Sequence, residues 1–199
     1  GSIVSDPAEL RIMLGIPDTV DAALNSNVVG SVYALAAQDD GRMMIGGSFT
    51  RVGLTLRNRI ARLHPNGSLD LTFGAIGNAP LPLAAQEVRA LAIQPDGKIL
   101  VGGDFVRFNN VACGRLVRIH PDGSLDPSFQ LATGADNRIR QIRLQPDGKI
   151  LTSGWFTRFN GVSRPGIARL HPDGRLDTAF APTISGSGVD TVAIQPDGR

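Results

Sequence analysis

Val88–Phe105 reads VRALAIQPDGKILVGGDF and Arg115–Phe129 reads RLVRIHPDGSLDPSF, and together these stretches make a unit that the chain repeats. A second copy spans residues 32–73, a third spans 139–180, and a partial fourth spans 189–199. Their Asp-Gly pairs, which begin at Asp40, Asp96, Asp147 and Asp197, are 56, 51 and 50 residues apart. Repeats of this length are typical of propeller blades, since solenoid rungs usually have about 20–30 residues.

Each copy predicts short β-strands separated by turns. Val88–Gln94 alternates small and larger residues with a period of two, as strands do. The Pro-Asp-Gly at 95–97 is a tight turn, because glycine tolerates positive φ and aspartate bonds its own backbone. Ile99–Val101 then forms a second strand. Leu116–Ile119 forms a third after a linker, and a short fourth segment ends at Phe129.

The second strand is apolar on both faces, so it needs cover on both sides. A propeller supplies that cover, because each blade packs between two neighbours. We therefore predict an all-β fold, a β-propeller of about four blades or part of a larger ring, with blades of about 50 residues. A β-solenoid is the second alternative.

The two ends of the chain hold incomplete repeats. Leu10–Asp21 aligns with Leu116–Asp126, so residues 1–29 are predicted to be a half-repeat that completes a blade, and residues 30–199 the propeller repeats. Either the termini share one blade, or the chain pairs with a second copy as a homo-oligomer, or it is an arc of a larger ring. A helical turn is expected at most near residues 7–13.

Composition excludes several classes of protein. Hydrophobic residues make up 42% and charged residues 19%, which is typical of a globular chain rather than a disordered one. The formal charge of +2 argues against nucleic acid as the main partner. Cys113 is the single cysteine, so no disulfide forms within the chain. No apolar run is long enough for membrane insertion.

The repeated motifs point to a known family. AIQPDGKILVGGDF at 92–105, followed by RIHPDGSLDPSF at 118–129, resembles the delta-sixty repeat, a kelch-like bacterial β-propeller repeat. The resemblance implies a propeller fold and a secreted or cell-surface location in a Gram-negative bacterium, and it implies no reaction. Trp155 departs from the pattern, since it stands where Asp104 does in the preceding copy.

The residues that could carry chemistry recur in step with the repeat. His64, His120 and His171 precede equivalent turns, which indicates a structural role in hydrogen bonding across the turn rather than a catalytic or metal-binding one. Aspartates also recur beside arginines, and we expect one ion pair in each blade that ties the third strand to the fourth segment. These are Asp70 with Arg62, Asp126 with Arg118, and Asp177 with Arg169. We expect no catalytic residue, no metal site and no cofactor.

Arginine and tryptophan supply the candidates for binding. Arg51, Arg107 and Arg158 recur once per blade, and if they reach one rim they would form a positive ring for carboxylates or sulfated sugars. Further arginines lie in the linkers, at Arg57, Arg59, Arg115 and Arg164. The alternative is that these arginines pair with the repeat aspartates. Trp155 and Asp104 complete the predicted binding residues, because this position varies and Trp often contacts sugars or proteins.

The sequence thus favours a non-catalytic binding module that presents propeller loops to a protein or a glycan. A structural spacer in a large surface protein is the first alternative. A hydrolase built on a propeller is the least favoured, because no acid/base cluster stands outside the repeat.

Overall fold

The computed structural model describes residues 3–6, 9–12, 27–74, 86–186 and 188–195. Its regular elements are β-strands and their pairs are antiparallel, which confirms the all-β prediction. No helix in this described part has the length and hydropathy needed to span a membrane.

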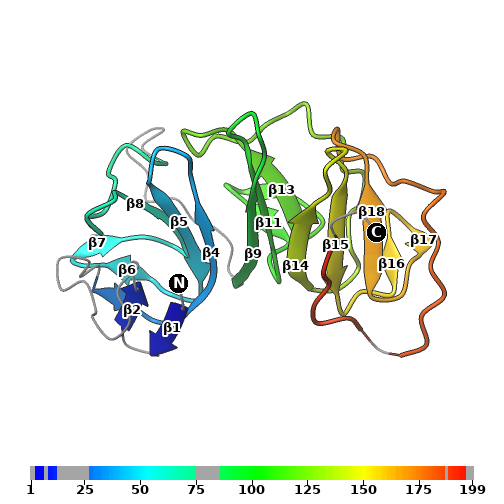
Figure 1. Cartoon of the computed structure of the whole chain (residues 1–199), viewed down its shortest axis with the longest axis horizontal. Helices are drawn as coiled ribbons and strands as arrows, with labels where there is room; N and C mark the ends of the chain where they lie inside the picture. The colour runs from blue at the N-terminus through cyan, green and yellow to red at the C-terminus, as the bar shows by residue number, and fades with distance from the viewer. Residues whose placement is uncertain (1–2, 7–8, 13–26, 75–85, 187, 196–199) are drawn as a thin grey trace.

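Each repeat folds into a three-stranded sheet, called a blade below (Figure 1). Blade 1 contains β4 (Val32–Ala37), β5 (Met43–Gly47) and β8 (Ile60–Leu63). Blade 2 contains β9 (Val88–Ile93), β10 (Ile99–Gly103) and β13 (Leu116–Ile119). Blade 3 contains β14 (Ile139–Leu144), β15 (Ile150–Gly154) and β18 (Ile167–Leu170). The second strand is central in every blade, as expected for the strand that is apolar on both faces.

Turns and a short edge complete the blade as predicted. The Asp-Gly turns join the first strand to the second, and their glycines have positive φ, at Gly41 (81°), Gly97 (80°) and Gly148 (80°). The fourth segment meets the third strand at one bridge per blade, at Leu63–Leu69, Ile119–Leu125 and Leu170–Leu176.

The linker predicted between the second and third strands is wrong, since each repeat forms a small hairpin there. The hairpins are β6 (Arg51–Val52) with β7 (Thr55–Leu56), β11 (Arg107–Phe108) with β12 (Val111–Ala112), and β16 (Arg158–Phe159) with β17 (Val162–Ser163). Positive φ at Asn109 (48°) and Asn110 (64°) closes the second hairpin with a two-residue turn. Asn160-Gly161 does the same in blade 3.

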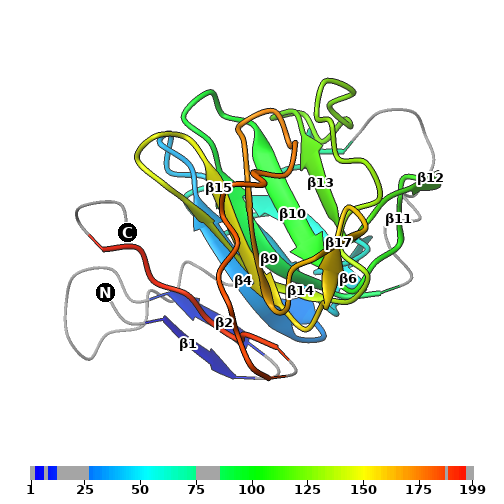
Figure 2. The same ribbon diagram turned by 90° about the vertical axis from the view of Figure 1, so that its right-hand side faces the viewer.

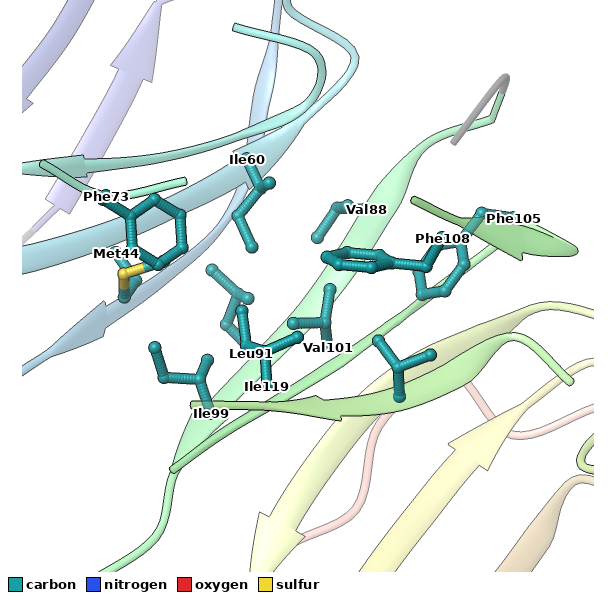
Figure 3. Packing of buried hydrophobic residues seen from close by; sticks show 11 residues of the cluster. Met44, Ile60, Phe73, Val88, Leu91, Ile99, Val101, Phe105, Phe108 and Ile119 are labelled. Atoms are coloured by element: carbon teal, nitrogen blue, oxygen red, sulfur yellow. The ribbon is translucent and has the colours of Figure 1, made fainter. Parts of the chain in front are cut away.

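Successive blades pack face to face. The first strands β4, β9 and β14 contact one another in order. Small alanines in β4 and β9 suit the close approach of those two strands, whereas β14 has none. Figure 3 shows Met44 and Ile60 of blade 1 against Leu91 and Ile99 of blade 2, in one buried cluster. Viewed along the row, the first strands overlap on one side of the molecule and hairpin β11–β12 lies on the other (Figure 2).

The described residues form an arc rather than a closed ring. β1 (Ile3–Asp6) pairs with β2 (Glu9–Ile12), so the helical turn expected there is wrong. This hairpin lies at the blade 1 end of the row, and residues 188–195 lie at the opposite end (Figure 1). Most of the half-repeat at 10–21 falls outside the described residues, so its role in completing a blade stays a prediction. β3 (Val28–Val29) extends the first hairpin by pairing with β6.

Candidate functional site

The predicted ion pair is present in all three blades, and in blade 2 it joins two repeats. Nε of Arg118 lies 2.8 Å from Oδ2 of Asp126, and both side chains are buried. The guanidinium lies over the ring of Phe129, 4.7 Å from its centroid, and Nη1 donates to the carbonyl of Pro172 in blade 3 at 2.6 Å. Arg62 and Asp70 repeat this arrangement between blades 1 and 2. In blades 1 and 2 the pair is therefore a clamp between blades.

The recurring histidines border these pairs. Nε2 of His64 lies 3.9 Å from Asp70, and Nε2 of His120 lies 3.9 Å from Asp126. The backbone N–H of each histidine donates across its turn, as in His120 to the carbonyl of Ser124 at 2.8 Å. The bond across the turn is as expected, but the backbone rather than the imidazole makes it.

Acid should weaken the clamps. Burial alone would raise the pKa of Asp126, but hydrogen bonds from Ser128 and Arg118 outweigh it and hold that pKa well below its ordinary range. The same balance lowers the pKa of Asp70. An aspartate whose pKa is lower in the folded protein than in the unfolded chain, where it is about 3.9, stabilises the fold at pH values above about 4. This stabilisation is lost as the pH falls below that value. We expect the urea midpoint to fall steeply below about pH 4, and less steeply in Asp126→Asn. Parallel pH profiles for the two proteins would contradict the assignment.

A polar depression of about 420 Å³ lies where the three blades meet. Adjacent antiparallel strands bring the start of the first strand, the end of the second and the start of the third to one edge of each blade. The lining residues come from these positions: Ser48, Arg59, Gln86, Glu87, Arg89, Asp104, Arg115, Asn137 and Arg138.

A β-bulge shapes the edge of blade 2. The pairing of β9 with β10 shifts register between Gly102 and Gly103, and the N–H of Asp104 then donates to the carbonyl of Glu87 at 2.9 Å. A Cβ on Gly103 would lie 2.0 Å from that carbonyl oxygen. Only glycine therefore fits, and the bulge places the side chains of Glu87 and Asp104 on the same rim.

Arg89 holds both carboxylates of the depression. Its Nε donates to Oδ2 of Asp104 at 2.9 Å, and its Nη2 donates to Glu87. Nε of Arg138 lies 3.3 Å from the other oxygen of Asp104. Four arginines and two carboxylates line the depression, so its formal charge is +2.

Trp155 continues this network into blade 3. The guanidinium carbons of Arg138 and Arg140 lie 4.9 Å and 5.8 Å from its ring centroid, within the range of cation–π interaction. Its Nε1 donates to Oδ1 of Asp190 at 2.8 Å, and 42% of the residue is exposed. In blade 1 a different position supplies an aromatic contact, since Tyr33 of β4 lies 5.1 Å from the guanidinium carbon of Arg89.

Two of the lining arginines have a costly backbone conformation. Arg59 and Arg115 stand directly before the third strands with φ of 69° and 63°, in the left-handed region that side chains disfavour. Blade 3 has Gly166 in this place, with φ of 73°. The fold thus accepts glycine here, yet blades 1 and 2 carry arginine at a cost of about 1–2 kcal/mol each. Strain of this kind clusters at functional sites.

The structure brings together only part of the predicted binding set. Asp104 lines the depression and Trp155 contacts its wall through Arg138. The recurring arginines instead lie on the separate hairpins, where each donates to a carbonyl of its own turn: Arg51 to Leu54, Arg107 to Asn110, and Arg158 to Gly161. These contacts lie within each hairpin and involve no repeat aspartate, and a positive ring at one rim stays a prediction.

Sequence reasoning missed Glu87, Arg89 and Arg138. The available signal was variation between repeats at the start of the first strand, where Ser31, Glu87 and Arg138 are equivalent. No group of three or more histidine, cysteine, aspartate or glutamate side chains in the described ranges could hold a metal ion.

Packed antiparallel blades around a polar depression define the class of protein as a β-propeller. The chain belongs to the family described as a domain of unknown function (DUF5122) beta-propeller, whose model matches residues 38–73, 94–129 and 145–180. A comparison of the sequence with curated proteins gives no match.

Solved structures with similar folds include the WD40 beta propeller domain of Doa1, with a TM-score of 0.55 and 16% identity, covering 88% of this chain and 48% of that one. A protein of unknown function from Bacteroides caccae has a TM-score of 0.39 and 16% identity, covering 84% and 51%. A catalytically inactive virginiamycin B lyase from Staphylococcus aureus with quinupristin has a TM-score of 0.39 and 20% identity, covering 84% and 43%. The chain therefore spans about half the length of these structures, and the similarity to Doa1 concerns the fold alone.

Proposed function

We propose that this chain is a non-catalytic binding module that takes an anionic ligand in the depression between the three blades. The observation that carries the proposal is the lining of four arginines with only two carboxylates, both of which are already bonded by Arg89. Guanidinium groups match the planar geometry of carboxylate and sulfate groups. The two carboxylates of the lining that could act as acid or base, Glu87 and Asp104, are both bonded by Arg89, which supports a binding role.

The shape of the site favours an acidic glycan over an acidic protein. A concave volume of about 420 Å³ has the size of small-ligand sites, whereas protein partners usually bury wide, flat surfaces. Tyr33 and Trp155 stand partly exposed, each against an arginine of the lining. We therefore propose a saccharide that carries carboxylate or sulfate groups.

Location and assembly belong to the same proposal. The resemblance to the kelch-like delta-sixty repeat supports a secreted or surface protein of a Gram-negative bacterium. The arc of three blades supports completion of the ring by further blades, from a second copy or from a longer chain (Figure 1).

Calorimetric titration with heparin hexasaccharide tests the proposed function, with neutral maltohexaose as the control ligand. We expect binding of heparin alone, weakened by salt. Heparin recovered uncleaved after incubation would agree with a binding role. No binding to heparin or to an acidic glycan array would instead favour the spacer, and capture of an acidic protein partner would contradict the glycan.

The double variant Arg59→Gly, Arg115→Gly separates binding from folding. It removes two guanidinium groups, so we expect affinity for the hexasaccharide to fall about tenfold to a hundredfold, at about 1.4 kcal/mol per tenfold. Glycine also relieves the left-handed strain, which offsets the lost hydrogen bond from Arg115 to the carbonyl of Ala135. We therefore expect stability within about 1 kcal/mol of the original in urea unfolding. Unchanged affinity in this variant would rule out the depression as the site.

A further inference from the structure

One position in the hairpins breaks the repeat inside the fold. Cys113 follows β12, where the other two repeats have Arg57 and Arg164. The backbone is the same in all three, because each residue donates its N–H to an equivalent carbonyl at 2.9 Å: Arg57 to Thr50, Cys113 to Val106, and Arg164 to Thr157. The three side chains therefore leave the backbone at equivalent points of their blades.

In blade 3 the arginine fills the space beneath the hairpin. Arg164 is only 8% exposed, and its Nη2 donates to the carbonyl of Thr178 at 3.1 Å. Thr178 directly follows Asp177, the aspartate of the blade 3 ion pair, and its counterpart in blade 2 is Pro127. The arginine thus spans the distance from the hairpin to the fourth segment.

In blade 2 the short cysteine leaves that space open. A cavity of about 410 Å³ lies between β12, β13 and the fourth segment. Its lining is Val111, Ala112, Cys113, Gly114, Leu116, Val117, Arg118, Leu125, Asp126, Pro127, Phe129, Leu131 and Ala132. The two charged members, Arg118 and Asp126, are bonded to each other. The surface offered to a ligand is therefore mainly aliphatic, with one aromatic ring.

We propose that this cavity is a binding site for a small neutral apolar molecule, such as an aromatic ring with a short apolar substituent. Its volume lies in the range of small-ligand sites, and an apolar lining of this kind holds water poorly. Burial raises the pKa of Cys113 to about 11, so the thiol is neutral at pH 7 and acts as part of the apolar wall. The site is separate from the polar depression, since Cys113 and Leu125 line one and Glu87 and Arg89 line the other.

The fluorescent probe N-phenyl-1-naphthylamine tests this site. We expect saturable enhancement of its fluorescence with the unmodified protein and with Cys113→Ala, which leaves the cavity open. Cys113→Arg restores the residue of the neighbouring repeats, so we expect its affinity for the probe to fall at least about tenfold. Equal binding by Cys113→Arg, in a protein shown by circular dichroism to be folded, would overturn the proposal.

The thiol provides a second test that needs no variant. Cys113 is the only cysteine, so its rate of reaction with 5,5′-dithiobis(2-nitrobenzoate) reports on this cavity alone. Saturating probe should slow the reaction about tenfold or more if the probe covers the thiol. If the thiol reacted at an unchanged rate while fluorescence showed the probe bound, the probe would bind elsewhere and the proposal would fail. Absence of any probe binding would equally reject the site.

Discussion

Asp126→Ala will lower the free energy of unfolding by about 3–5 kcal/mol, because it leaves a guanidinium buried without its carboxylate. Arg118 is 7% exposed and joins Asp126 at 2.8 Å. The substitution also removes the acceptor for the N–H and hydroxyl of Ser128. Urea unfolding followed by circular dichroism measures the loss.

Asp177→Ala is the matched control for the link between blades. Its partner Arg169 is 22% exposed, and in the described part of the chain it has no bond like the one from Arg118 to Pro172. We expect Asp177→Ala to cost less than half as much as Asp126→Ala. Equal losses would show that the clamp acts within a blade only.

Gly103→Ala is expected to cost about 3 kcal/mol or more, because the new Cβ meets backbone rather than a flexible side chain. The ideal Cβ would lie 2.0 Å from the carbonyl oxygen of Glu87, and this oxygen already accepts the N–H of Asp104. Relief requires β9 and β10 to separate at the bulge. The rim of the depression would then be displaced, so heparin binding should be lost with stability.

Gly161→Ala distinguishes this collision from the general effect of replacing glycine. Nothing lies within 4 Å of its Cβ position, and its φ of 79° is the only obstacle. We expect a loss of about 1 kcal/mol and unchanged heparin binding. A loss at Gly103 no greater than at Gly161 would contradict the close approach of the two strands at the bulge.

Much of the blade was predictable because its signals are local and recur. The Pro-Asp-Gly turns, the alternation in β9 and the apolar second strand each depend on residues close together in the chain. The hairpins escaped prediction because each strand in them has two residues, too few for a periodic pattern to emerge. The Asn-Asn at 109–110 and the Asn-Gly at 160–161 were the available turn signals.

The candidate site was less predictable than the fold. Trp155 was found because it breaks the repeat, and Asp104 because it is the residue that Trp155 replaces. Arg107 and its equivalents were chosen because they recur, but recurrence indicates a role inside each hairpin, where they bond their own turns. Several residues of the site shared by the three blades differ from copy to copy, as Glu87 and Arg138 do.

The sequence alone determined the repeat with its strands and turns. It also determined the pairing of each arginine with its aspartate, since these partners lie eight residues apart in every copy. The polar depression and the cavity beside Cys113 required the folded molecule. Arg59, Arg89 and Arg138 meet because three blades converge, and their proximity depends on the packing angle between sheets, which no local pattern encodes. The cavity depends on a side chain that is short where its neighbours are long, and such a void exists only once the surrounding residues are packed.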